Sequence, residues 1–239
     1  MVLAQSAVMH TPIVVGPGLS PLEGARIDVA IDDLMAEFTL TQSFRNTTAD
    51  DIEAVFTFPV PLDAIYLGLN ARLGERELEG RIVEKQQARL TYETAISKGD
   101  SAVLVERAEA GLLTSNVGNL RPGETLELRL RFGQWLSFNG RRVSFRVPTT
   151  IAPRYGRSDL DPREAPVTDL LAQYGFAAEV AIRGLLTRAE LHSPSHLLVL
   201  RREGEAVSLS LTAGAMDRDF LLDAEFGAIE RCSVTSDRD

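Results

Sequence analysis

The chain has 239 residues, of which 44% are hydrophobic and 25% are charged, and its formal net charge is −9. This composition is typical of a globular protein that can bury a core without disulfide bonds. The acidic balance disfavours nucleic acid and anionic membrane surfaces as partners, because binding to either needs a basic patch on the protein.

The cysteine content and the first thirty residues bear on the cellular compartment. Cys232 is the single cysteine, so no intramolecular disulfide can form, as is usual in a reducing compartment. Arg26 is the one Lys or Arg among the first thirty residues, and Pro12, Pro17 and Pro21 interrupt their apolar stretch, which does not fit a secretory signal. No stretch approaches the roughly 18 apolar residues of a membrane span. We therefore expect a cytoplasmic protein without membrane insertion; an extracellular or periplasmic location stays open for a chain trimmed of its signal.

Alternating apolar and polar residues predict most of the fold. Residues 1–24 are rich in Gly, Pro and small side chains and are predicted to form an N-terminal arm. Four later stretches have the period of two that is typical of half-buried strands. Their alternating members are Ala36, Phe38, Leu40, Gln42 and Phe44; Ile52, Ala54, Phe56 and Phe58; Ile65, Leu67, Leu69, Ala71 and Leu73; and Leu126, Leu128, Leu130 and Phe132. Strands of this length with short turns between them predict a mainly β protein, an antiparallel β-sandwich.

One segment, residues 83–98, predicts an amphipathic helix. It contains no Gly or Pro, and Gly99 follows where a C-terminal capping glycine is expected. Ala88 and Tyr92 begin a narrow apolar stripe that continues at positions 95 and 96 and can face the sheet. We expect Tyr92 to be largely buried.

The C-terminal third predicts a second small β region. Residues 156–175 combine charges with two prolines and are interpreted as a connector. The alternating pattern then resumes over residues 176–239 and ends in an apolar strand face formed by Phe220, Leu222, Ala224 and Phe226. About 64 residues are few for an independent core, so we expect this region to form one rigid unit with the sandwich and to leave an apolar patch near the C-terminus.

An ordered set of short motifs resembles a known family. The set comprises Glu84, Lys85, Ala88 and Tyr92 in the helix segment; Asn116-Val117-Gly118-Asn119-Leu120 with Pro122-Gly123-Glu124; Phe58-Pro59; and a run from Pro148 to Tyr155 that contains Pro153 and Arg154. Together they resemble the VIT (vault protein inter-alpha-trypsin) domain over residues 25–155. The motif residues are interpreted as structural, since the Pro122-Gly123 pair is typical of a tight turn and prolines suit an edge strand.

The resemblance implies an interaction role. In proteins of this kind, among them the inter-alpha-trypsin inhibitor heavy chains, a VIT domain is usually followed by a von Willebrand factor A-type domain with a metal-binding Asp-x-Ser-x-Ser motif. That motif does not occur in the 239 residues. We therefore expect the N-terminal part of a longer protein: a non-catalytic scaffold without cofactor or bound metal. Its partner would be an A-type domain in cis or an unidentified protein in trans.

Residues with catalytic or metal-binding potential have simpler interpretations. His192 and His196 have the spacing of zinc ligands on a helix, but Pro194 predicts an extended segment, in which they would lie roughly 13 Å apart. Cys232 has no neighbouring basic cluster that would activate its thiol. No catalytic, metal or cofactor-binding residue is therefore predicted.

A carbohydrate-binding or carbohydrate-cleaving sandwich is the main alternative function. Aromatic residues are only 6% of the chain, and Trp135 is the single tryptophan. Trp135 is predicted to pack in the core or between domains, and a binding patch with Phe132 and Phe138 is the other interpretation.

Overall fold

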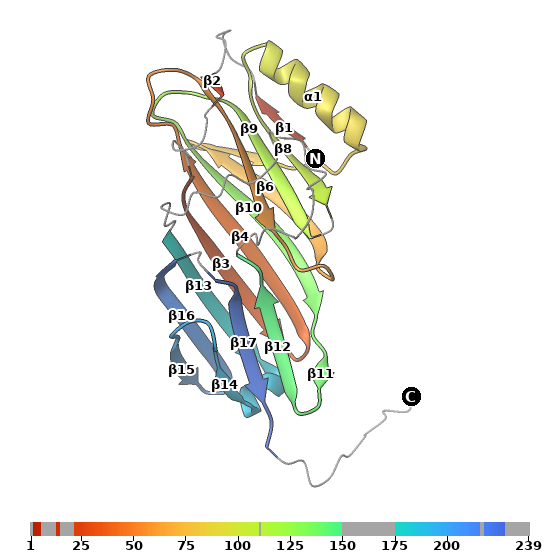
Figure 1. The fold of residues 1–239 in the computed structure, drawn as a ribbon, viewed down its shortest axis with the longest axis vertical. Coiled ribbons are helices and arrows are strands. Elements are labelled where there is room, and N and C mark those ends of the chain that lie inside the picture. Colours follow the sequence, from red (N-terminus) through yellow and green to blue (C-terminus); the bar gives the residue numbers. More distant parts are fainter. Residues whose placement is uncertain are drawn as a thin grey trace, which may run out of the picture.

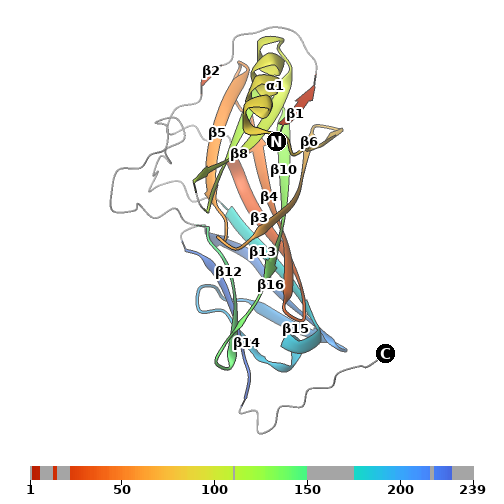
Figure 2. The ribbon, with the colours of Figure 1, turned by 90° about the vertical axis from the view of Figure 1, so that its right-hand side faces the viewer.

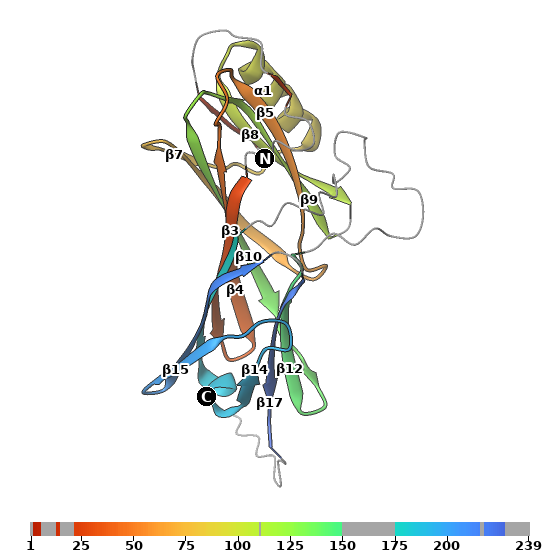
Figure 3. The same ribbon diagram turned by 60° about the vertical axis from the view of Figure 1, so that its left-hand side comes forward.

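The computed structural model describes residues 2–5, 13–14, 22–109, 111–149, 175–215 and 218–227. In this part of the chain the protein is mainly β, with one α-helix and three sheets, and it is elongated (Figure 1). The predicted fold class is therefore confirmed. The largest sheet runs through the whole length of the molecule, and two smaller sheets lie against its two ends (Figures 2 and 3).

The large sheet has eight strands in the order β15-β16-β13-β3-β4-β10-β6-β7. They are β3 (Leu22–Asp32), β4 (Met35–Arg45), β6 (Ile65–Leu73), β7 (Arg76–Glu79), β10 (Thr125–Trp135), β13 (Gly175–Arg183), β15 (Val199–Glu203) and β16 (Ala206–Ala215). All neighbours pair antiparallel except β3 and β13, which are parallel over nine residue pairs from Gly175–Gly24 to Arg183–Asp32. Most pairings are therefore antiparallel, as predicted. This pairing is parallel, and so is a short one in the five-stranded sheet, from Ile13–Ile52 to Val14–Glu53.

The two smaller sheets contain the remaining strands of the described chain. The five-stranded sheet has the order β1-β8-β9-β5-β2, with β1 (Val2–Gln5), β2 (Ile13–Val14), β5 (Ile52–Pro59), β8 (Ser101–Glu109) and β9 (Leu112–Leu120). The four-stranded sheet has the order β11-β12-β17-β14, with β11 (Phe138–Asn139), β12 (Arg142–Val147), β14 (Glu190–His192) and β17 (Phe220–Glu225). A short 3-10 helix, η1 (Gly184–Arg188), links β13 to β14. Two strands, β1 and β2, therefore lie within the predicted N-terminal arm.

One continuous apolar core joins all three sheets. It contains Ile52 and Val117 from the five-stranded sheet as well as Val143 from the four-stranded sheet. A series of aromatic rings runs through the part of this core that lies between the large sheet and the four-stranded sheet. The ring pairs are Phe38–Phe132 (5.1 Å between centroids), Phe38–Phe145 (5.8 Å), Phe145–Phe220 (6.4 Å) and Phe176–Phe220 (6.2 Å).

The strands after residue 175 are built into the same body as the earlier ones. β13 lies beside β3 in the large sheet, and β17 pairs with β12 from Arg142–Glu225 to Val147–Phe220. Phe220, Leu222 and Ala224, three members of the apolar face seen in the sequence, are buried in the common core. The second β region therefore supplies strands to sheets of the first and shares the main core with them.

A β-bulge changes the direction of the side chains at the start of β6. Arg131 of β10 is opposite Gly68 and Phe132 is opposite Tyr66, so Leu67 has no partner on β10. As a result the Tyr66 ring turns inward and meets the Phe132 ring edge-on at 5.8 Å. Ile65 and Leu67, which the alternation places on the apolar face with Leu69, are instead 67% and 47% exposed.

The single α-helix of the described chain, α1, spans Lys85–Ser97, within the predicted range 83–98. Gly99 follows with φ = +78°, as expected of a capping glycine. Its N–H donates to the carbonyl of Ile96, and the N–H of Asp100 donates to that of Ala95. These two bonds form a Schellman motif, which satisfies carbonyls at the C-terminus of the helix.

Candidate interaction sites: the helix dock and the outer patch

The helix packs on the face of the five-stranded sheet that points away from the large sheet (Figure 2). Its buried residues form a small apolar cluster, separate from the main core, with two residues of β8. The members are Ala88, Tyr92, Ala95, Ala102 and Leu104, and Ile96 packs against them. Tyr92 is 7% exposed, which confirms that it is largely buried. We call this cluster, together with residues 116–124, which form the end of β9 and the turn after it, the helix dock.

Two polar contacts fasten the helix to the sheet. The Tyr92 hydroxyl donates to Oε1 of Glu53 at 2.9 Å. Burial, and then the negative charge of Glu53, raise the pKa of Tyr92 far above its ordinary value. Arg89 and Glu106 form a two-pronged ion pair, with Nε–Oε1 at 2.8 Å and Nη2–Oε2 at 3.0 Å. Because Glu106 is buried, removing Arg89 would leave a poorly solvated charge beneath the helix.

Gly118 of β9 allows the helix to approach the sheet closely. A Cβ atom at this position would lie 2.2 Å from Cδ1 of Ile96 and 2.6 Å from the Tyr92 hydroxyl oxygen. Both distances are far below van der Waals contact. The glycine of the Asn-Val-Gly-Asn-Leu motif is therefore needed for packing.

Asn119, the next residue, caps the end of the helix from the sheet. Its backbone has φ = +53°, a left-handed conformation that Asn tolerates better than most residues. The side-chain amide nitrogen donates to the carbonyls of Ile96 (3.0 Å) and Asp100 (2.9 Å). The Asn119 carbonyl in turn accepts a hydrogen bond from the hydroxyl of Ser101 at 3.0 Å. Asn119 thus connects the helix, β8 and β9.

The Pro122-Gly123 turn is locked by a buried asparagine from another part of the chain. Gly123 has φ = +74°, and its N–H donates to the carbonyl of Asn46 at 2.8 Å. The Asn46 side chain donates to the carbonyls of Asp50 and Leu120, both at 2.7 Å. Sequence reasoning did not single out Asn46, although its position at the start of an Asn-Thr-Thr turn is a signal for such a role.

The other motif residues also have placements that relate to the architecture. Glu84 is the N-cap of the helix, and its carbonyl accepts from the N–H of Ala88, but its side chain makes no capping hydrogen bond. Lys85 is the first helical residue. Pro153, Arg154 and Tyr155 lie outside the described residues.

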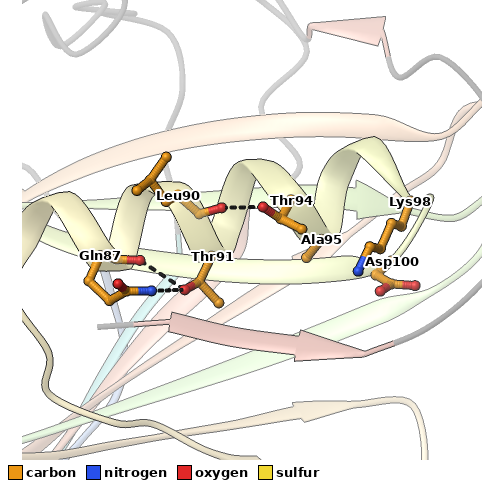
Figure 4. A pocket seen from close by; sticks show the side chains of 7 residues that line it. All are labelled: Gln87, Leu90, Thr91, Thr94, Ala95, Lys98 and Asp100. Carbon is orange, nitrogen blue, oxygen red and sulfur yellow. Dashed lines mark hydrogen bonds between the residues drawn. The ribbon is translucent and has the colours of Figure 1, made fainter.

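A shallow groove runs along one side of the helix (Figure 4). Its volume is about 300 Å³, and it is lined by Gln87, Leu90, Thr91, Thr94, Ala95, Lys98 and Asp100. The hydroxyls of Thr91 and Thr94 donate to the helix carbonyls of Gln87 and Leu90, at 2.8 and 2.6 Å. These threonine hydroxyls are thus directed at the helix backbone.

The two histidines singled out in the sequence lie in different surroundings. His192 ends β14, where its Nε2 is 3.7 Å from Oδ2 of Asp223. The Ser144 hydroxyl donates to the other oxygen of Asp223 at 2.6 Å, so the carboxylate lies between serine and histidine. A serine nucleophile needs the histidine in the middle, and this row does not provide that order.

His196 lies against the core. Its ring centroid is 5.8 Å from that of Phe176 and 5.9 Å from that of Phe220, and its Nδ1 is 2.8 Å from the Ser195 hydroxyl oxygen. The described parts of the chain contain no group of three or more His, Cys, Asp or Glu side chains placed to hold a metal ion.

Exposed apolar side chains gather on the outer face of the large sheet, which faces away from both smaller sheets. They are Met35 (46% exposed), Ile65 (67%), Leu67 (47%) and Trp135 (66%). Met35 lies directly opposite Trp135 on neighbouring strands, and Ile65 lies opposite Gly133. A Cβ atom on Gly133 would lie 3.5 Å from Cδ1 of Leu67, so Leu67 covers this glycine. We call these four residues the outer patch.

Trp135 was predicted to pack in the core or between domains, and the prediction of the core is wrong, since the side chain is 66% exposed. Phe132 points into the core, so Trp135, three residues later on the same strand, points to the opposite face. Phe138 does not join it, since it pairs with the inward-facing Val143 and its ring packs on Phe226 at 5.5 Å.

The fold, the dock and its motifs correspond to a known domain. Residues 22–132 match the family model of the vault protein inter-alpha-trypsin domain, so this part of the chain is a VIT domain. The match includes the whole helix dock and ends at residue 132, before the four-stranded sheet. The resemblance seen in the sequence extends further, to residue 155.

Several proteins are similar to this chain in sequence. The mouse (Mus musculus) "von Willebrand factor A domain-containing protein 5A" is 25% identical over 227 residues, which are 90% of this chain and 29% of that protein. The mouse "Protein mono-ADP-ribosyltransferase PARP4" is 30% identical over 133 residues, 56% of this chain and 7% of that protein. The chain thus spans less than a third of the length of the curated relatives it matches.

Among solved structures, an M1 zinc metallopeptidase mutant from Deinococcus radiodurans is similar over 88% of this chain and 44% of that one, with 12% identity and a TM-score of 0.43. This likeness is too loose to carry an argument about function. No helix in the described residues is long and apolar enough to cross a membrane.

Proposed function

We propose that this chain is a non-catalytic protein-interaction module that presents the outer patch to another folded protein. The observation that carries the proposal is the exposure of Trp135, Met35, Ile65 and Leu67, 46–67% each, side by side on one sheet face. Contiguous exposed apolar residues on a globular protein are typical of protein interfaces, and Trp is enriched at their energetic centres.

The rest of the described molecule supports a scaffold role. The motif residues of the helix dock are engaged in packing and backbone hydrogen bonds, which hold the helix and three strands in one arrangement. The main core, which links all three sheets, gives the patch a rigid base. A rigid, preorganised surface loses little conformational entropy when a partner binds.

The partner that we propose is an A-type domain in the same polypeptide, or a partner protein in trans. The support is that relatives matching 90% of this chain are named for a von Willebrand factor A domain and extend well beyond the matched part. The ADP-ribosyltransferase activity in the name of the other relative belongs to that protein, whose match here covers 7% of its length.

Trp135 provides the readout for a test. As the single tryptophan, it alone reports on the outer patch, and covering its exposed ring shifts the fluorescence emission to shorter wavelength. We expect this shift when the A-type domain of the mouse relative is titrated into the chain, together with a binding isotherm by calorimetry. Pull-down with the chain, compared with its Trp135→Ser variant, extends the test to partners in trans. If neither experiment detects a protein that depends on Trp135, the proposed function is wrong.

Carbohydrate binding is the second candidate, and the exposed Trp135 ring is the observation that favours it. A flat aromatic ring on a sheet can support a sugar ring. The neighbours of Trp135 in the patch are apolar, however, whereas sugar hydroxyls require polar partners. A titration with oligosaccharides that shifted Trp135 fluorescence, with no response to proteins, would favour this alternative.

A further inference from the structure

We propose that the partner of the outer patch in trans is a second copy of this chain, so that two copies associate about a two-fold axis with their outer faces in contact. This inference rests on the proposed function and names the occupant of the same surface. Three features support it: how the patch is built, the charges around it, and its area.

The patch exists because the fold turns apolar residues outward at one end of the large sheet. Without the bulge at Leu67, the alternation in β6 would direct Ile65 and Leu67 into the core with Leu69. The bulge brings Tyr66 inward and leaves two large apolar side chains in solvent beside Trp135. Exposing them has a free-energy cost of roughly 25 cal/mol per Å². Bulges are often retained because they redirect side chains. A partner that covered the patch would remove these side chains from water and so offset the cost.

The charges around the patch permit self-association. Asp32 and Arg183 continue the row that contains Met35 and Trp135, and Glu37 and Arg131 lie in the neighbouring rows. In these rows of the sheet the two acids and the two arginines balance each other, whereas the whole chain carries a charge of −9. Arg131 donates to Glu37 through Nε at 3.0 Å, which keeps this pair on the surface at the edge of the patch. The outer face can therefore approach its own copy with less repulsion than the molecule as a whole suggests.

The area of the patch fits the centre of such an interface. Given the exposed fractions and the 150–250 Å² of a large aromatic side chain, the four residues expose on the order of 400 Å². A stable interface buries about 800 Å² per partner, with an apolar centre inside a polar rim. The outer patch thus supplies about half of the required area, and the charged border residues supply the beginning of the rim. In an isologous pair Trp135 of each copy would contact the Ile65 and Leu67 side of the other.

The experiment is sedimentation equilibrium of the full chain, with Trp135 fluorescence recorded over the same concentrations, from about 1 to 200 μM. We expect a monomer–dimer equilibrium in this range and an emission shift to shorter wavelength as dimer forms. Added salt should strengthen the dimer, because it screens the net charge of −9 on each copy while the apolar contact is unaffected.

Matched variants locate the interface. Leu67→Ser and Trp135→Ser should each weaken the dimer about tenfold or more, as expected for central interface residues. Leu197→Ser removes a side chain that is 96% exposed and lies outside the patch, and should leave the dimer unchanged. Circular dichroism of each variant verifies that it remains folded.

Two results would overturn the proposal: a chain that stays monomeric throughout, or a dimer that Leu67→Ser and Trp135→Ser leave intact. A monomeric chain whose Trp135 emission shifts with an A-type domain would reject the second copy and leave the proposed function standing. A monomer that responds to no protein would reject both.

Discussion

The helix dock and the outer patch each contain an aromatic side chain on a sheet face, but the dock buries this side chain and the patch exposes it. In the dock, Tyr92 is 7% exposed, its hydroxyl is bonded to Glu53, and a glycine makes room for it. In the outer patch, Trp135 is 66% exposed beside three other apolar side chains. The dock is completed within the chain, whereas the patch has a surface that another molecule can complete.

This difference shows why motif density does not identify the interaction surface. The motif residues from 116 to 124 concentrate where the backbone has demanding geometry, namely a positive φ at Asn119 and Gly123 and a close approach at Gly118. Few residue types satisfy such positions, which makes them recognisable in sequence. Many apolar residues can form an interaction patch, so the outer patch has no comparable signature. Changes in the dock should therefore reduce stability, and changes in the patch should reduce binding alone.

The largest effect is expected for Tyr92→Ala. It removes a buried ring from the small cluster under the helix and leaves a cavity, which should lower the free energy of unfolding by about 3 kcal/mol. Urea denaturation followed by circular dichroism measures it. Tyr92→Phe is the control. It keeps the ring and loses the hydrogen bond to Glu53, which should lower the free energy of unfolding by about 1 kcal/mol. Equal losses for the two variants would mean that the ring packing contributes little.

The second largest effect is expected for Gly118→Ala, which should lower the free energy of unfolding by about 2 kcal/mol. The new Cβ would overlap Ile96 and the Tyr92 hydroxyl and force the helix outward. Gly68→Ala is the matched control on β6, since a Cβ there meets nothing within 4 Å. Thermal denaturation of both variants provides the comparison. A Gly118→Ala protein as stable as the control variant would show that the helix adjusts freely.

The raised pKa of Tyr92 predicts a loss of stability at alkaline pH. The unfolded chain releases this phenolic proton near pH 10, while the folded protein retains it to higher pH. The stabilising contribution is therefore fully present below about pH 10 and decreases above it, by about 1.4 kcal/mol per pH unit. Urea denaturation between pH 9 and about 11 should show this slope, and Tyr92→Phe should reduce it. An unchanged slope in that variant would assign the effect to other groups.

The smallest effect on stability is expected for Trp135→Ser. Because the ring is 66% exposed, its removal should change the free energy of unfolding by no more than about 0.5 kcal/mol. The same variant should lose the binding tested above, which no change in the dock that leaves the protein folded should do. A Trp135→Ser loss as large as that of Tyr92→Ala would remove the distinction between the two regions.

The sequence by itself determined the local elements. Alternation of apolar residues predicted β4, β5 and β10, because a strand with one buried face imposes a period of two on its side chains. The helix and its capping Gly99 followed equally from local chemistry. The family resemblance selected dock residues such as Gly118 and Asn119, although their roles became visible only when helix and sheet were seen together.

Only the tertiary structure decided how these elements combine. The parallel pairing of β3 with β13 joins residues about 150 positions apart, and no local pattern specifies such a partner. The bulge at Leu67 reverses the faces of Ile65 and Tyr66 although the apolar alternation of β6 continues unbroken, because the register with β10 overrides it. The exposure of Trp135 depends on the same register and on the absence of a covering layer on that face in the described chain. Periodicity is a property of one strand, whereas pairing and exposure depend on long-range packing, and the outer patch arises from that packing.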